Sequence, residues 1–197
     1  MADDLGPWSP LTVRQTIELF EPAPFRWWIS GGYALELFVG RTWRHHEDMD
    51  VGVCRRDAPA MAGLLGGWDL HVAAGGRLTP WDGTALDPGR HQNNVWCRRT
   101  PASPWSLDLT IGDGDEGSWV YRRDPSLRLR WDDAVLRTAD DVPYLAPDLQ
   151  LLFKSTNVRP KDDEDAQQVI PVIPPERRAR LRRWLPADHV WRRLLTA

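Results

Sequence analysis

One short strand pattern constrains this chain more than any other feature. Residues 48–53, Asp-Met-Asp-Val-Gly-Val, alternate between polar and apolar side chains, which predicts a strand with one buried face. Asp48 and Asp50 are two residues apart, so both carboxylates leave the same face. Carboxylates that are half buried together repel each other, and a divalent cation between them removes that repulsion. The alternative interpretation is an acidic strand face exposed to solvent.

A strand that ends at two glycines precedes this motif. Residues 25–29 are apolar and aromatic, and Ser30, Gly31 and Gly32 separate them from a helix predicted over residues 33–39. Glycines let the backbone approach a bound group closely, and amide N–H groups at a helix N-terminus can receive phosphate oxygens. The alternative is a tight strand-to-helix turn with no ligand.

A third aspartate stands in another predicted strand. Residues 105–111, Trp-Ser-Leu-Asp-Leu-Thr-Ile, place Asp108 among apolar neighbours, where a carboxylate is costly to bury unless it is paired or liganded. Beside the first strand, Asp108 would complete a three-carboxylate site for one or two metal ions, and we expect the three side chains to converge close to Gly31 and Gly32. The alternative is a capped or solvent-facing Asp108 on a half-exposed strand.

The pattern of predicted elements changes along the chain. Short strand-like runs dominate between residues 68 and 131, and helical periodicity begins at Pro147, which indicates an α+β fold. We divide the chain into a catalytic domain over residues 1–143 and a helical region over residues 144–197. The net charge of -3 gives no general electrostatic footprint for nucleic acid, although a local basic patch stays open.

The ordered motifs resemble the DNA polymerase β-like nucleotidyltransferase superfamily, in particular the bacterial aminoglycoside and lincosamide nucleotidyltransferases and their relatives. The likeness begins at Ser30-Gly31-Gly32 and continues through residues 40–50. Further similar blocks extend it over most of residues 28–165, and they are residues 96–98, 107–109, 119–124, 143–147, 151–154 and 159–162. The stretch between the glycines and Asp48 is longer than in minimal members of the superfamily. Antibiotic-modifying enzymes have a similar extension, and the acceptor stays open.

The resemblance implies a mixed sheet that bears the aspartates, followed by a helical domain. It implies transfer of a nucleoside monophosphate from an NTP to an acceptor hydroxyl, with one or two Mg²⁺ ions. Asp48 and Asp50 would hold metal, and Asp108 would share a metal ion, act as the base, or both. The residues expected to contact the nucleotide are Ser30, Gly31, Gly32, Arg41, Arg44 and Lys154.

Several of these residues have structural alternatives. Arg41 and Arg44 suit phosphate oxygens, but they could instead form ion pairs with Glu36, Glu47 or Asp48. Lys154 resembles a lysine that approaches the nucleotide, or it carries its charge to solvent along an apolar stem. We expect His46 to be a hydrogen-bonding partner of the aspartates rather than a metal ligand.

The functional hypotheses differ in the molecule that would accept the nucleotide. A small molecule such as an aminoglycoside fits antibiotic resistance, and residues 113–116 with Asp140 and Asp141 could supply carboxylates for a polycation or be solvated loops. An RNA or protein acceptor, as in AMPylation, is supported only by the Arg-rich run at residues 177–183. A non-catalytic nucleotide-binding module is disfavoured because all three aspartates are present. Two unpaired cysteines and the lack of a stretch of roughly 20 apolar residues predict a cytoplasmic protein without a membrane partner.

Overall fold

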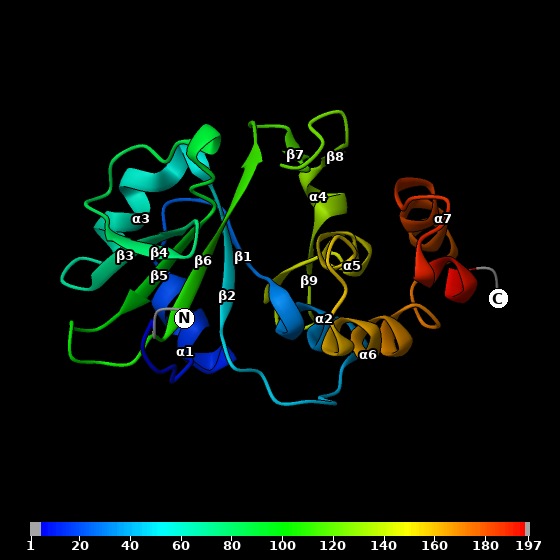
Figure 1. The fold of residues 1–197 in the computed structure, drawn as a ribbon, viewed down its shortest axis with the longest axis horizontal. Coiled ribbons are helices and arrows are strands. Elements are labelled where there is room, and N and C mark those ends of the chain that lie inside the picture. The colour runs from blue at the N-terminus through cyan, green and yellow to red at the C-terminus, as the bar shows by residue number, and fades with distance from the viewer. Residues whose placement is uncertain (1–4, 196–197) are drawn as a thin grey trace.

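Ten strands build one mixed sheet within residues 5–195, the part of the chain that the computed structural model describes (Figure 1). Eight of them lie in the order β4-β3-β5-β6-β2-β1-β10-β9, while β7 pairs with β6 and β8 pairs with β7. The pairs β2–β6 and β1–β10 are parallel, and the other pairs are antiparallel. In chain order the strands are β1 (Trp27–Ile29), β2 (Asp50–Cys54), β3 (Asp69–Ala74), β4 (Arg77–Pro80), β5 (Asn94–Arg98), β6 (Leu107–Gly114), β7 (Ser118–Val120), β8 (Arg128–Arg130), β9 (Val135–Arg137) and β10 (Pro143–Leu145).

Helices cover the sheet and extend one end of it. They are α1 (Val13–Phe20), α2 (Gly31–Val39), α3 (Ala58–Leu64), α4 (Trp131–Ala134), α5 (Pro147–Lys154), α6 (Pro160–Val169) and α7 (Pro175–Trp184), with three short 3₁₀ helices, η1 (Arg55–Asp57), η2 (Pro88–Arg90) and η3 (Val190–Leu195). Among residues 5–195, no helix is long and apolar enough to cross a membrane. The predicted α+β class with a mixed sheet is confirmed.

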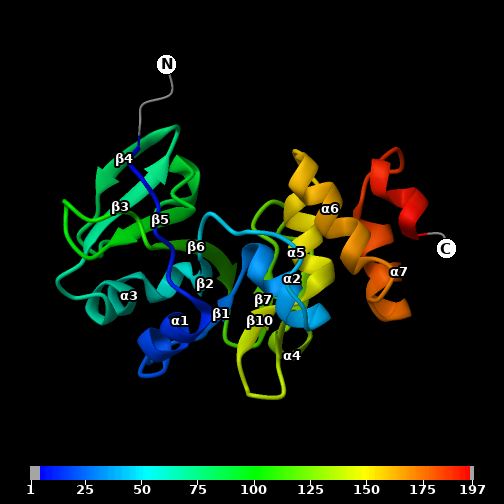
Figure 2. The same cartoon turned by 90° about the horizontal axis from the view of Figure 1, so that it is seen from below.

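The helical end joins the sheet through α2. Helices α5, α6 and α7 gather on the right in Figure 1, and α2 lies between them and the strands, as Figure 2 also shows. Helix α2 contacts β2, β10, α5 and α6. The boundary placed between residues 143 and 144 falls inside β10, which pairs with β1, so the helical region begins at Pro147. Helix α2 therefore connects the C-terminal helices α5 and α6 to strands β2 and β10 of the sheet.

The alternating patterns bury one face of each central strand. Met49, Val51 and Val53 are fully buried, and Leu107 and Leu109 are buried beside them on β6. The β-branched and aliphatic side chains on this face form the core, while the polar residues of the same strands occupy the opposite face. The sheet thus presents its aspartates on the side away from this packing.

Two glycines make room for one tryptophan on β1. Trp28 pairs with Gly52 across β1 and β2, and only 2% of its surface is exposed. A Cβ atom at Gly52 would collide with the Trp28 indole, and one at Gly112 would lie 3.2 Å from it. The large ring can lie over the adjacent strands only because these positions lack side chains.

A buried carboxylate ties α7 to α5. Asp148 in the first turn of α5 is 1% exposed. Its carboxylate accepts hydrogen bonds from Nη1 of Arg177 at 3.1 Å and from Nε of Arg180 at 2.6 Å. Two arginines of the basic run are therefore engaged inside the protein.

Replacing Asp148 with alanine should destabilise the fold, because it leaves two partly buried guanidinium groups without their carboxylate. We expect the free energy of unfolding in urea to fall by about 3 kcal/mol, in the range for breaking a buried ion pair. The control is Glu18→Ala, which removes the exposed pair with Arg14 on α1 and should change stability little. Equal losses in the two variants would contradict the anchoring role of Asp148.

Candidate active site

Two of the three predicted aspartates lie side by side. Asp50 opens β2 and Asp108 stands opposite it in the parallel β2–β6 pair. The Asp108 N–H donates to the carbonyl of Met49 at 2.8 Å, and the Ser30 N–H donates to the carbonyl of Asp50 at 2.9 Å. Three chain segments therefore meet at this edge of the sheet, where β1 ends and both aspartate strands begin.

The turn after β1 approaches Asp50 closely. Gly31 has a φ of +66°, and a Cβ atom there would collide with Oδ2 of Asp50. The Gly31 N–H donates to Oε1 of Gln150 on α5 at 2.9 Å. A Cβ atom at Gly32 would collide with the rings and guanidinium of His46 and Arg44. Gly31 thus lets the backbone pass the Asp50 carboxylate, and Gly32 leaves room for the side chains of His46 and Arg44. The close approach to a bound group that the sequence suggested stays a prediction.

The neighbouring carboxylates resist ionisation. Burial, followed by the charge of Asp48, raises the pKa of Asp50 to about 7, although Lys154 and Lys161 oppose the shift. Burial, followed by the charge of Asp50, raises the pKa of Asp108 well above its ordinary value. Nδ2 of Asn94, on β5, donates to both Asp108 oxygens at 3.0 and 2.9 Å, which opposes this shift. A cation here would relieve the repulsion between the ionised groups.

These residues fit a hard divalent cation, because they offer carboxylate oxygens and no soft donors. Within residues 5–195, however, no three His, Cys, Asp or Glu side chains form a group ready to hold a metal ion. Asp48 lies just before β2 and, in addition to burial, its charge raises the pKa of both Asp50 and Asp108. The convergence of the three side chains on one metal ion stays a prediction. A metal ion here would need oxygens from its substrate.

The two predicted phosphate-binding arginines point elsewhere. The guanidinium of Arg44 donates to Asp165 on α6, from Nε at 2.9 Å and from Nη2 at 3.0 Å. Arg41 donates to the side chain of Gln168 and lies over the Trp43 ring, 5.8 Å from its centroid. Neither arginine lines the groove beside Asp50. They attach the segment before β2 to α6, with partners other than those expected from the sequence.

Lys154 lies in the groove but its charge is already balanced. Its Nζ is 2.9 Å from Oδ1 of Asp162 and 3.1 Å from Oδ2 of Asp165. Its side chain is only 8% exposed, so the lysine is held by two buried carboxylates rather than reaching solvent. It lines the groove together with Gly31 and Asp50. Contact with a nucleotide stays a prediction for this residue.

His46 is not a partner of the aspartates. Its Nε2 lies 3.0 Å from Oε1 of Glu36 on α2, and its ring packs against Tyr33 with centroids 4.2 Å apart. The side chain is buried, and burial followed by the charge of Arg44 lowers its pKa. The Glu36 carboxylate also accepts hydrogen bonds from the N–H groups of Trp43 and Arg44. His46 therefore packs the extended segment onto α2.

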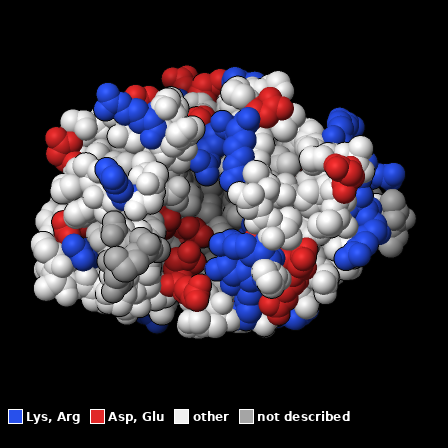
Figure 3. Space-filling model, in the orientation of Figure 1, with Lys and Arg blue, Asp and Glu red and all other residues white. Residues whose placement is uncertain are grey.

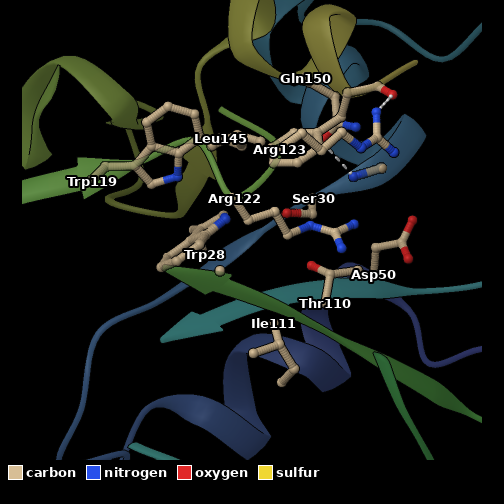
Figure 4. A pocket seen from close by; sticks show the side chains of 13 residues that line it. Trp28, Ser30, Asp50, Thr110, Ile111, Trp119, Arg122, Arg123, Leu145 and Gln150 are labelled. Carbon is tan, nitrogen blue, oxygen red and sulfur yellow. Dashed lines mark hydrogen bonds between the residues drawn. The ribbon is translucent and has the colours of Figure 1, made fainter. Parts of the chain in front are cut away.

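The groove beside Asp50 has a polar end and an aromatic end (Figure 4). In the space-filling view, acidic side chains line one side of the central hollow and basic side chains lie on the other sides (Figure 3). The apolar lining comes from Trp28, Trp119, Leu145 and Phe153. The polar lining that the sequence did not single out comes from Thr110, Arg122, Arg123, Gln150 and Arg159. Gln150 could have been recognised from the sequence, because it interrupts the apolar face of α5. Nothing in the local sequence pattern marks Arg122 and Arg123 as groove residues.

Comparisons with known proteins show which folds this chain resembles. Residues 12–73 match the family model described as aminoglycoside-2''-adenylyltransferase. The lincosamide adenylyltransferase LnuA, in a lincomycin-bound crystal structure, is similar with a TM-score of 0.58 and 18% identity, over 84% of this chain and 100% of that chain. The antibiotic-resistance factor ANT(2'')-Ia is similar in a solution structure, with a TM-score of 0.56 and 13% identity, over 87% of each chain.

A crystal structure of ANT(2'')-Ia with adenylyl-2''-tobramycin is also similar, with a TM-score of 0.53 and 13% identity, over 87% of this chain and 95% of that chain. A search of curated proteins finds no match. The predicted resemblance to nucleotidyltransferases is confirmed in the fold, and residues 12–73 carry the family match.

The raised pKa of Asp50 predicts a pH-dependent stability. Its folded pKa of about 7 lies above the unfolded value, so the folded state binds the extra proton and stability falls as pH rises between about 4 and 7. Asp50→Asn removes this ionisation. Measured in urea with EDTA, the variant should exceed wild type in stability by more at pH 8 than at pH 5, by a further 1 to 2 kcal/mol in order of magnitude. The same gain at both pH values would contradict the shift.

Proposed function

We propose, from the nucleotidyltransferase fold as premise, that this protein transfers a nucleoside monophosphate from an NTP to a hydroxyl of a small molecule. One observation carries the proposal: Asp50 and Asp108 are paired on parallel strands at the edge where the Gly31 backbone approaches Asp50. Charged carboxylates, a glycine turn and a helix N-terminus at one point suit a phosphate with its cation. A reaction that consumes NTP also fits the cytoplasmic location expected from the sequence.

The carboxylates have different tasks in this reaction. Asp48 and Asp50 would hold Mg²⁺, which would neutralise charge on the phosphates. Asp108 accepts the proton of the acceptor hydroxyl, whose oxygen bonds to the α-phosphorus while the bond to the bridging oxygen breaks and pyrophosphate leaves. Asn94 holds both oxygens of Asp108, so the carboxylate keeps one orientation toward the acceptor.

The nucleotide lies along the turn that begins α2. The turn residues Ser30, Gly31 and Gly32 allow the phosphates to approach the backbone. Lys154 lines the same groove and can contact the nucleotide, although Asp162 and Asp165 already balance its charge. Arg41 and Arg44 do not contact the nucleotide in this arrangement. They bond to Gln168 and Asp165 on α6 and so hold the segment that leads into Asp48.

A small-molecule acceptor is favoured over RNA or protein. The Arg-rich helix α7, which was the support for RNA, uses Arg177 and Arg180 to hold buried Asp148. The acidic segments suggested for a polycation are also engaged, because Asp113 pairs with Arg55 and other members pair with arginines on the surface. None of these carboxylates lines the groove beside Asp50.

A transfer screen identifies the acceptor. Labelled ATP, GTP, CTP and UTP are incubated with Mg²⁺ and the protein against aminoglycosides, lincosamides, RNA and total cell protein. Label on an antibiotic-like small molecule supports the proposal. Label found only on RNA or protein would replace the proposed acceptor class, and no transfer from any NTP would remove the proposed reaction.

Loss of either metal-binding aspartate should abolish Mg²⁺-dependent NTP binding. Asp48→Asn and Asp50→Asn each remove one negative ligand without adding volume, so both variants should remain folded. Calorimetric titration with Mg²⁺–NTP is the measurement, and Asp132→Asn on the exposed face of α4 is the matched control. Wild-type affinity in both variants would show that the metal site lies elsewhere.

Asp108→Asn separates the base from the metal ligand. The amide still offers an oxygen but cannot take up the proton, so Mg²⁺–NTP should bind while transfer falls by about two to four orders of magnitude. The measurement pairs calorimetry with single-turnover transfer to the acceptor found in the screen. Parallel losses of binding and rate would make Asp108 chiefly a ligand, and an unchanged rate would exclude it from catalysis.

A further inference from the structure

Arg122 is a partly buried cation without a counterion in the groove. It lies in the turn between β7 and β8, and within residues 5–195 no hydrogen bond or ion pair engages its guanidinium. Its nearest described contact is the ring of Phe153, 5.4 Å from the guanidinium carbon to the centroid. A guanidinium held against an aromatic face without a carboxylate is incompletely compensated for its loss of water.

The other cations of the groove are already occupied. Lys154 pairs with Asp162 and Asp165, and Arg159 pairs with Asp162. Arg123 donates through Nη1 to the carbonyl of Phe153 at 2.7 Å and to Oγ1 of Thr156 at 2.6 Å. Arg123 thereby fixes the turn on α5, and its neighbour Arg122 is left with its donors directed into the groove.

Figure 4 shows where those donors lie. The side chain of Arg122 extends from the Trp28 side of the groove, and its guanidinium lies between Ser30 and Thr110 and is directed toward Asp50. All of these residues line the same cavity. The charge is thus at the polar end, next to the carboxylates and the glycine turn, rather than at the aromatic end formed with Trp119.

Electrostatics favour an anion at this place. Burial, followed by the positive charge of Arg123, lowers the pKa of Arg122, and Tyr121 and Asp113 only partly oppose this shift. Asp113 is itself paired with Arg55 at 2.9 Å. An anion beside Arg122 would compensate the positive charge that burial leaves without a partner, and guanidinium donors match phosphate oxygens two at a time.

We propose that Arg122 binds phosphate oxygens of the NTP, a task for which the sequence favoured Arg41 and Arg44. The inference rests on the proposed function and adds a residue to it. Mg²⁺ held by the carboxylates would neutralise part of the phosphate charge, and Arg122 adds a second positive group at the same polar end of the groove. Arg122 forms no covalent bond, and it stabilises the negative charge that the phosphate oxygens carry during transfer.

The test compares the affinity for nucleotides with the affinity for a polyphosphate that carries no nucleobase. Wild type, Arg122→Ala, Arg122→Gln and Arg122→Lys are titrated calorimetrically with Mg²⁺–ATP, Mg²⁺–GTP and tripolyphosphate with Mg²⁺. We expect Arg122→Ala and Arg122→Gln to weaken binding of all three probes by roughly 10- to 100-fold, as for loss of a charge-assisted hydrogen bond. Arg122→Lys keeps the charge without the planar fork and should lose less.

The control is Arg128→Ala, which removes an exposed arginine of the next strand, paired with Asp115, and should leave all affinities unchanged. Urea unfolding checks that each variant is folded, and Arg122→Gln keeps most of the side-chain volume if the alanine variant is unstable. Tripolyphosphate affinity unchanged in Arg122→Gln would overturn the inference. If the affinity fell for ATP and GTP but not for tripolyphosphate, Arg122 would contact the nucleoside and not the phosphates, which would also overturn the inference. Wild-type protein that binds no NTP would overturn the proposed function itself.

Discussion

The parallel pairing of β2 with β6 forces two carboxylates together, and the surrounding structure is arranged around that repulsion. Asp50 and Asp108 are paired across the strands, so neither can move away without loss of sheet register. Asn94 donates to both oxygens of Asp108 and lowers the energy of its charged form. Gly31 leaves no side chain against Asp50. The site is electrostatically unfavourable by itself and becomes favourable with a cation.

Buried aspartates also hold the helices to the sheet. Asp165 accepts from Arg44 and lies 3.1 Å from Lys154, while Asp148 accepts from two arginines of α7. Each of these carboxylates joins elements distant in sequence, and each has its charge matched by nearby cations. The pairs give little stability for their number, because removing charges from water costs free energy. Their effect is to fix orientation: the segment that leads into Asp48 can lie in one place only.

The local sequence pattern was sufficient to predict the strands that carry the aspartates. It was insufficient to predict which side chains surround those aspartates. Alternation predicted β2 and β6 because one face of each strand is buried, and the glycine pair predicted the turn because backbone must pass Asp50. The partners of Arg44 and Arg41 lie 121 and 127 residues away along the chain, so no local rule could choose between phosphate and ion pair. Arg122 stands in a turn without periodicity, and its direction depends on how β7 packs on α5.

The tryptophan that lies over Gly52 and Gly112 belongs both to the groove and to the core. Trp28 shapes the aromatic end of the groove, whereas the carboxylates stand at the other end and are fixed by strand pairing. Because Trp28 is only 2% exposed and its ring fills the space above two strands, a smaller residue at position 28 would widen the groove and also leave a cavity in the core. The width of the groove at this end is therefore linked to the stability of the sheet that carries Asp50 and Asp108.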